Sequence, residues 1–135
     1  MTQLERHALP QRILVLDDDA EVGLAVVTLL SGYDIAAQHV QDEQQARQAL
    51  TQAQSRQAPF NALVCDLRLA AGVDGLEVAQ RLQHSFDPPL PLLLVTGETS
   101  AQRLQRVHEA GVAVLFKPVA ADALLQALIN LRRAT

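Results

Sequence analysis

The length, composition and charge of the chain exclude several classes of protein. Its 135 residues are 49% apolar and 19% charged, which is typical of one globular domain with a sizeable core and not of a disordered chain. The net charge of −4 argues against direct binding to nucleic acid, because such binding relies on clustered lysine and arginine.

Cysteine use and hydropathy bear on the compartment. The single cysteine, Cys65, excludes an intramolecular disulfide and suits a reducing compartment. The apolar run Leu90–Val95 contains a proline and is too short to span a bilayer, and residues 1–12 lack the apolar core of a signal peptide. We therefore expect no membrane insertion and a cytoplasmic location, either alone or as the cytoplasmic part of a larger protein.

The first half of the chain alternates apolar strands with amphipathic helices. Ile13–Leu16 is a continuous apolar run, as expected for a strand covered on both faces. A helix that ends at Gly32 follows, and Ile35–Val40 predicts a weaker strand. The apolar positions of that helix are Val22, Val26, Leu29 and Leu30.

Asp42 begins the next helix, and Gln45 is placed to complete a capping box. The expected buried side of this helix consists of Ala46, Ala49, Leu50 and Ala53. Pro59 ends the connection, and Ala62–Cys65 is a third apolar strand that leads directly into Asp66.

The pattern repeats in the second half. After a loop of small residues, Asp74-Gly75 opens a helix, and Pro88 and Pro89 break the chain before the strand Leu92–Val95. Val112–Phe116 predicts the fifth strand. The expected inward positions of the three helices are Leu76, Ala79 and Leu82, then Leu104, Val107 and Ala110, then Leu124, Leu125, Leu128 and Leu131. Thr99 or Ser100 caps the middle one, and Gly111 ends it.

Five strands alternating with five helices predict an α/β fold with a parallel sheet covered on both faces. Residues 12–133 would form this domain and residues 1–11 an N-terminal extension, with no sign of a second domain. In such open sheets, ligands bind beyond the carboxyl ends of the strands, where the strand order reverses. Residues that follow the strands are therefore the candidates for a site.

Charged and polar residues collect at these strand ends. They are Asp17 and Asp18 after the first strand, Asp66 after the third, Thr96 and Gly97 after the fourth, and Lys117 and Pro118 after the fifth. Carboxylate oxygens suit Mg²⁺, which would relieve the repulsion among the acids. A lysine and a hydroxyl would bind phosphoryl oxygens, and an ionised carboxylate can itself be the nucleophile that becomes an aspartyl-phosphate.

Five segments, ILVLDDD, LVCDLRL, VDGLEVAQRL, LLLVTGE and VLFKPV, occur in this order between Arg12 and Leu131. Together they resemble the CheY-like receiver domain of response regulators in two-component signalling. The resemblance implies a flavodoxin-like three-layer sandwich whose five parallel strands have the order 2-1-3-4-5. It also implies a domain that catalyses its own phosphotransfer and autodephosphorylation.

The resemblance assigns roles to the strand-end residues. Asp66 would be the phosphoacceptor; Asp17, Asp18 and the backbone carbonyl of Arg68 would join it in binding Mg²⁺, or Mn²⁺ in its place. Thr96 would be the switch hydroxyl and Lys117 the phosphate-binding ammonium, with a cis bond between Lys117 and Pro118. The small Gly97 would let a phosphodonor reach Asp66. The donor would be a sensor histidine kinase or a histidine phosphotransfer domain, and dimerisation is allowed but not required.

The chain also departs from the family pattern. The loop from Asp66 to Asp74 is one residue longer than in many free-standing regulators and lacks their proline, which suggests the receiver segment of a hybrid sensor histidine kinase. Val114 stands where the family often has an aromatic switch partner, and Phe116 need not replace it.

Two other functions are considered. A small haloacid-dehalogenase-like phosphatase would use Asp17 as the nucleophile with Asp19, Thr96 and Lys117, but it leaves Asp66 unexplained. A receiver that is never phosphorylated would serve only as a protein-binding scaffold. Among the remaining residues, we expect Asp19 to cap a helix, Cys65 to be buried, and the four histidines to be surface or partly buried residues without metal-ligand spacing.

Overall fold

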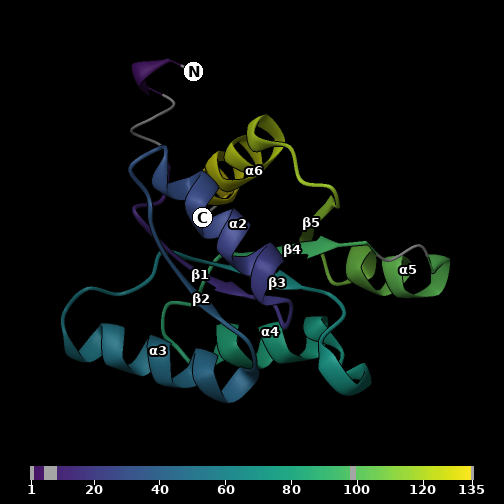
Figure 1. The fold of residues 1–135 in the computed structure, drawn as a ribbon. Helices are drawn as coiled ribbons and strands as arrows, with labels where there is room; N and C mark the ends of the chain where they lie inside the picture. The colour runs from purple at the N-terminus through teal and green to yellow at the C-terminus, as the bar shows by residue number, and fades with distance from the viewer. Residues whose placement is uncertain (1, 5–8, 98–99, 135) are drawn as a thin grey trace.

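The computed structural model describes residues 2–4, 9–97 and 100–134, and its centre is a five-stranded sheet (Figure 1). The strands are β1 (Arg12–Leu16), β2 (Ala36–Val40), β3 (Ala62–Asp66), β4 (Leu92–Thr96) and β5 (Ala113–Phe116). They lie in the order β2-β1-β3-β4-β5, and every neighbouring pair is parallel. The predicted flavodoxin-like topology is confirmed.

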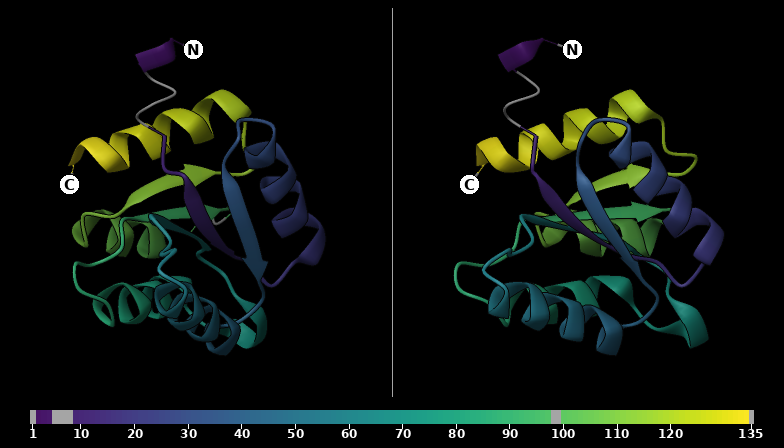
Figure 2. Two further views of the ribbon diagram at one scale, coloured as in Figure 1. Left: turned by 90° about the vertical axis from the view of Figure 1, so that its left-hand side faces the viewer. Right: turned by 60° about the vertical axis from the view of Figure 1, so that its left-hand side comes forward.

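Helices cover both faces of the sheet, which gives three layers (Figure 2). The helices of the described residues are α2 (Ala20–Ser31), α3 (Glu43–Ser55), α4 (Gly75–His84), α5 (Ala101–Glu109) and α6 (Ala121–Ala134), with a short 3-10 helix at Ala70–Gly72. Side chains of α2 and α6 pack on one face of the sheet, and those of α3, α4 and α5 pack on the other. A crossover helix after each strand is the connection that parallel pairing requires.

The strand residues alternate between the two cores, which is why the interior strands read as unbroken apolar runs. In β1, Leu14 and Leu16 pack under α3 and α4, whereas Ile13 and Val15 pack under α2 and α6. All five residues of β3 and of β4 are buried, as expected for strands covered on both faces. Cys65 is fully buried in this core, as predicted.

Short polar side chains begin the first four of these helices by accepting hydrogen bonds from backbone N–H groups. The caps are Asp19 for α2, Asp42 for α3, Asp74 for α4 and Ser100 for α5. Ser100 is thus one of the two predicted caps of α5, and Thr99 lies outside the described residues. Gly111, just beyond α5, has φ +70°, a conformation that glycine adopts without strain.

Several boundaries differ locally from the prediction. Ala110 is exposed and not inward, because α5 ends at Glu109 and Ala110 caps its carboxyl end. Ile35 is buried but precedes β2, since its N–H bonds Leu30 O at the end of α2. The side chain of Gln45 completes a capping interaction one residue earlier than expected, on the N–H of Gln41 at 2.9 Å.

The segment before β1 packs against the domain. Leu9 is buried in the core beneath α6, and the N–H groups of Gln11 and Arg12 both donate to Asn61 Oδ1. The chain therefore joins the sheet before β1 begins. None of the helices in the described residues is long and apolar enough to cross a membrane.

Candidate functional site

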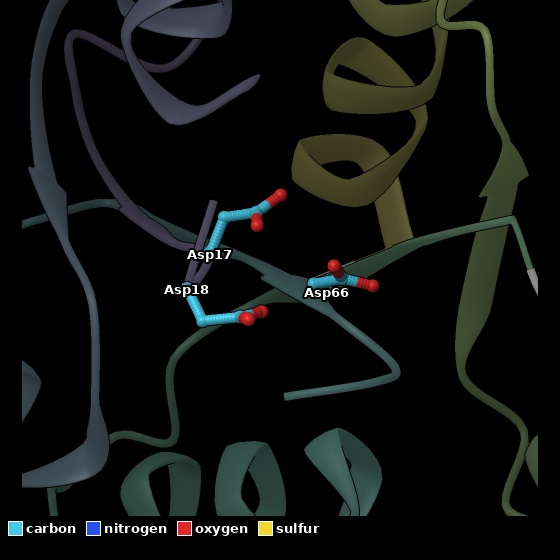
Figure 3. A group of neighbouring side chains, drawn as sticks. All are labelled: Asp17, Asp18 and Asp66. Carbon is cyan, nitrogen blue, oxygen red and sulfur yellow. The ribbon is translucent and has the colours of Figure 1, made fainter. Parts of the chain in front are cut away.

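The carboxyl ends of β1 and β3 bring three acidic side chains together. β1 and β3 are neighbours, with Leu16 paired to Cys65, so the next residues, Asp17 and Asp66, emerge side by side. Asp18 follows on the same loop, and Figure 3 shows the side chains of Asp17 and Asp18 extending toward the side on which Asp66 lies. One oxygen from each lies within 4.8 Å of the others. The convergence predicted for these acids is confirmed.

Lys117 completes this group from the end of β5. Its Nζ lies 3.1 Å from Asp66 Oδ2 and 3.4 Å from Asp17 Oδ2. Its backbone N–H donates to the carbonyl of Thr96 at 2.8 Å, which ties the residue after β5 to the end of β4. Thr96 itself is fully buried. The ammonium thus bridges the two buried carboxylates.

The second oxygen of each buried carboxylate is held by the backbone. Asp17 Oδ1 accepts from the N–H of Asp19 at 2.9 Å, and Asp66 Oδ1 accepts from the N–H of Arg68 at 3.2 Å. Side chains of Asp17 and Asp66 are only 7% and 9% exposed, whereas Asp18 is exposed. The two buried carboxylates therefore have restricted orientations, and Asp18 closes the group on the solvent side.

The electrostatics of the group follow from this burial. Desolvation raises the pKa of Asp17 above its ordinary value, aided by the nearby charge of Asp66, and outweighs the hydrogen bond from Asp19 and the charge of Lys117. Burial alone would lower the pKa of Lys117, but its hydrogen bonds and charge interactions with Asp66 and Asp17 leave that pKa raised. Lys117 is thus kept in its charged ammonium form. The ionised form of Asp17, in contrast, is destabilised by burial.

The donor set fits a divalent cation. Three carboxylates and one ammonium leave the group with a formal charge of −2. All three acids offer hard oxygen ligands from two adjacent loops, which is the chemistry that Mg²⁺ selects. A bound Mg²⁺ would offset both the desolvation of Asp17 and its repulsion by Asp66, which together raise the pKa of Asp17.

Gly75, which the sequence indicates only as the start of a helix, holds the loop that follows β3 in place. Gly75 is buried, and a Cβ built on it would overlap the backbone carbonyl of Asp66. Its N–H donates to Leu67 O at 2.8 Å. The first turn of α4 therefore rests directly on the backbone of Asp66, at a distance that no other residue type allows.

The remaining predicted residues lie around this group. Arg68 and Gly97 are exposed, and a Cβ added at Gly97 would meet nothing within 4 Å. The Lys117–Pro118 bond is cis, as the resemblance implied. Val114 is half-buried against the core under α3 and α4, whereas Phe116, the neighbour of Thr96 in the β4–β5 ladder, is 54% exposed.

One residue of the site has no sequence signal. His39, expected to be surface or partly buried, is part-buried, and its Nε2 lies 2.7 Å from the backbone carbonyl of Asp17. No spacing rule connects a residue of β2 with the loop after β1. The contact follows from the pairing of β1 with β2.

The arrangement does not support the haloacid-dehalogenase alternative. That reading needs Asp19 beside Asp17 as a second catalytic acid, but Asp19 is exposed and its Oδ1 caps α2 through the N–H groups of Glu21 and Val22. Asp66, which the alternative leaves unused, lies at the centre of the group with Asp17 and Lys117. Asp19 is the helix cap that the sequence predicted.

Comparison with known proteins gives the same result as the geometry. Residues 13–129 match the response regulator receiver domain family. The chain is 34% identical over 124 residues to the C4-dicarboxylate transport transcriptional regulatory protein DctD of Pseudomonas aeruginosa, covering 91% of this chain and 25% of that one. It is 32% identical over 124 residues to the transcriptional regulatory protein QseB of Haemophilus influenzae, covering 90% and 53%. The chain thus spans between a quarter and about half of these relatives.

Solved structures share the fold. The chemotaxis protein CheY4 of Vibrio cholerae is 26% identical, with a TM-score of 0.69 over 89% of this chain and 97% of that one. The BeF3-activated receiver domain of Klebsiella pneumoniae RstA has a TM-score of 0.74 at 21% identity, covering 90% and 98%. With its sheet order and the acidic group at the carboxyl ends of β1 and β3, the chain belongs to the response regulator receiver domain family of two-component signalling.

Proposed function

We propose that Asp66 accepts a phosphoryl group from a phosphohistidine of a sensor histidine kinase or a histidine phosphotransfer domain. The observation that carries this proposal is the orientation of Asp66. Its Oδ1 accepts a hydrogen bond from the N–H of Arg68, and its Oδ2 lies 3.1 Å from Lys117 Nζ. Both oxygens lie at the carboxyl edge of the sheet, beside Asp17 and Asp18. An oxygen of Asp66 attacks phosphorus, the P–N bond of the donor breaks, and its electron pair leaves with the imidazole.

Four groups would hold the metal ion. Asp17, Asp18 and Asp66 supply carboxylate oxygens, and the backbone carbonyl of Arg68 supplies a neutral one. Mg²⁺ is the expected ion and Mn²⁺ a substitute; when bound, it neutralises charge on the phosphoryl oxygens. The three carboxylates outnumber the single cation of the described group, Lys117, so the group has an excess negative charge that attracts a divalent ion.

The other residues act on the phosphoryl group or its approach. Lys117 would pass from Asp66 Oδ2 to a phosphoryl oxygen, and the hydroxyl of Thr96 would donate to another. Gly97 leaves open space beside the acceptor, which admits a donor side chain. Pro118 follows Lys117 through a cis peptide bond. The same residues would admit water, which gives autodephosphorylation.

Phosphorylation would then change the face formed by α5, β5 and α6. When Lys117 and Thr96 turn toward the phosphoryl group, β5 and its helices shift between two arrangements, one of which binds a partner. Val114 is half-buried at the position where the family often has an aromatic switch residue, so this change would occur without an aromatic side chain there.

We infer that residues 12–133 form the receiver domain and residues 1–11 an extension, and that the domain acts in the cytoplasm. The long loop from Asp66 to Asp74 favours the receiver part of a hybrid histidine kinase. The curated relatives are named transcriptional regulators, which favours a receiver joined to a DNA-binding output domain. The reading frame that surrounds the coding sequence distinguishes these contexts. The domain itself, with a net charge of −4, is not the part that binds nucleic acid.

Phosphoramidate, a small donor with a P–N bond, tests the assignment without a cognate kinase. The wild-type domain should be labelled at one site in the presence of Mg²⁺ and should not be labelled when EDTA is added before the donor. Hydroxylamine should remove the label by attacking the acyl phosphate, and Asp66→Asn should remove the labelling. Asp34→Asn is the matched control, because Asp34 is exposed at the opposite end of the sheet and its φ of 62° suits asparagine. Labelling that survives in Asp66→Asn would overturn the acceptor assignment. Absence of labelling and of Mg²⁺ binding in the wild type would favour the scaffold reading.

A further inference from the structure

His39 contacts the peptide group that joins the two acids of the β1–α2 loop. Its Nε2 lies 2.7 Å from the carbonyl oxygen of Asp17. A carbonyl oxygen only accepts, so the imidazole must carry its hydrogen on Nε2 and donate it. The peptide held in this way connects Asp17 to Asp18, and its orientation directs the side chain of Asp18.

The bond extends the β1–β2 ladder past the end of the strands. The last paired residues are Leu16 and Val40, and the N–H of Asp17 still donates to Val40 O at 3.1 Å. The carbonyl of Asp17 lies beyond the last pair of the ladder, and the side chain of His39 donates to it in place of a backbone N–H of β2. Both peptide groups of Asp17 are therefore bound to β2.

A second residue leaves room for this contact. Gly23 is buried at the end of the first turn of α2, and a Cβ built on it would overlap the imidazole ring of His39. Glycine destabilises a helix interior, so its presence there needs a reason in packing. The ring of His39 is that reason, because it reaches Asp17 by lying directly on the backbone of α2.

We propose that His39 is a positioning residue for the metal site: by holding the Asp17–Asp18 peptide, it keeps both carboxylates directed at Asp66, with Gly23 providing the space for its ring. This inference rests on the proposed function, since it assumes that the three acids share a divalent cation. His39 touches no ligand oxygen and acts through the backbone. Residues that orient metal ligands in this way contribute to affinity.

Two substitutions break the contact by different routes. His39→Phe keeps a ring of similar shape and removes the donor, and Gly23→Ala keeps the donor and displaces the ring. His39→Gln retains an N–H donor on a flexible side chain and serves as the conservative variant. His108→Phe is the matched control, because His108 is exposed in the last turn of α5, on the opposite face of the sheet from α2.

Isothermal titration of each variant with MgCl₂, beside its thermal unfolding, tests the proposal. His39→Phe and Gly23→Ala should bind Mg²⁺ about three- to tenfold more weakly than the wild type, as for one lost hydrogen bond, and His39→Gln should recover part of the affinity. His108→Phe should match the wild type. Wild-type affinity in a folded His39→Phe variant, even with a lowered Tm, would overturn the proposal and leave His39 a packing residue.

The wild-type protein provides a test that does not depend on a variant folding. Nitrogen NMR of the imidazoles should show His39 with its hydrogen on Nε2, and a ring protonated on Nδ1 alone would overturn the proposed bond. Failure of the wild type to bind Mg²⁺ has a different meaning. It would remove the proposed function itself, whatever the variants show.

Discussion

β4 and β5 are hydrogen-bonded neighbours, yet they are packed very differently. All five residues of β4 are buried, whereas β5 begins and ends with exposed residues, Ala113 and Phe116. The difference follows from position, because β4 lies between two strands, whereas β5 is an edge strand with α5 over one face and α6 over the other. Interior strands present Asp17, Asp66 and Thr96, and the edge strand presents Lys117.

This contrast separates two tasks. The acceptor and its acidic neighbours stand on strands that cannot shift without opening the core, so their geometry is kept. Lys117 and the proposed output face stand on an edge strand without a fully buried residue, so its displacement exposes less new apolar surface than displacement of β4 would. A receiver of this design needs few specific contacts on the output side, and Val114 in place of an aromatic residue is compatible with it.

The largest expected effect is on the rigid side. Gly75→Ala places a Cβ against the carbonyl of Asp66, so either α4 or the acceptor loop must move. We expect a loss of about 3 kcal/mol or more in the free energy of unfolding, measured with urea. Gly97→Ala is the control, since a Cβ there meets nothing within 4 Å, and it should change stability by less than about 0.5 kcal/mol. Equal stabilities for the two variants would contradict the close contact.

The same deletion in the two strands tests the contrast directly. Leu94 in β4 is fully buried, and Leu115 in β5 is half-buried. Leu94→Ala should cost about 3–5 kcal/mol and Leu115→Ala about 1–2 kcal/mol, because less apolar area leaves water at the edge. Chemical denaturation of both variants measures the difference. Similar losses would show that β5 is as tightly packed as β4.

Neutralising Asp17 should stabilise the domain when no metal is bound. Its pKa is raised mainly by burial, so the folded state binds a proton more tightly than the unfolded state does. The contribution of Asp17 to stability is therefore greatest below its ordinary pKa of 3.8 and decreases as the pH rises through the raised value. Asp17→Asn should raise stability at neutral pH in EDTA by about 1 kcal/mol and flatten this pH dependence.

Excess MgCl₂ should reverse the order. The wild type is then stabilised by the bound ion and the variant much less, as thermal unfolding in EDTA and in MgCl₂ would show. An Asp17→Asn domain that is less stable than the wild type in EDTA would contradict the raised pKa.

The smallest effect is expected where α5 meets α4. Arg106 Nη1 lies 2.8 Å from Asp74 Oδ2, and Nη2 lies 3.6 Å from Glu77 Oε1, but the arginine side chain is 48% exposed. Arg106→Gln should cost less than about 1 kcal/mol at low salt. The loss should shrink in 0.5 M NaCl, where the Debye length is about 4 Å compared with about 10 Å at 0.1 M. A large, salt-independent loss would mean that α5 is anchored as firmly as the interior strands.

Much of the site was predictable because each candidate follows an apolar strand. Asp17, Asp18, Asp66 and Lys117 were named from strand ends, and the structure brings their side chains together. Gly75 was not recognised as a contact of the acceptor, since a glycine at a helix start has several explanations. His39 was not recognised either, because a histidine in a strand carries no mark of the carbonyl that it binds.

Local sequence patterns are sufficient to predict the approximate positions of the strands, the caps of the helices and the types of group at the strand ends. These features depend on interactions within a few residues, such as apolar periodicity and the bonds of Asp19 and Asp42 to nearby N–H groups. Which of these groups come into contact depends on how the whole chain folds. Lys117 reaches Asp17 across 100 positions and His39 reaches it across 22, and such contacts exist because sheet pairing and helix packing bring distant segments together.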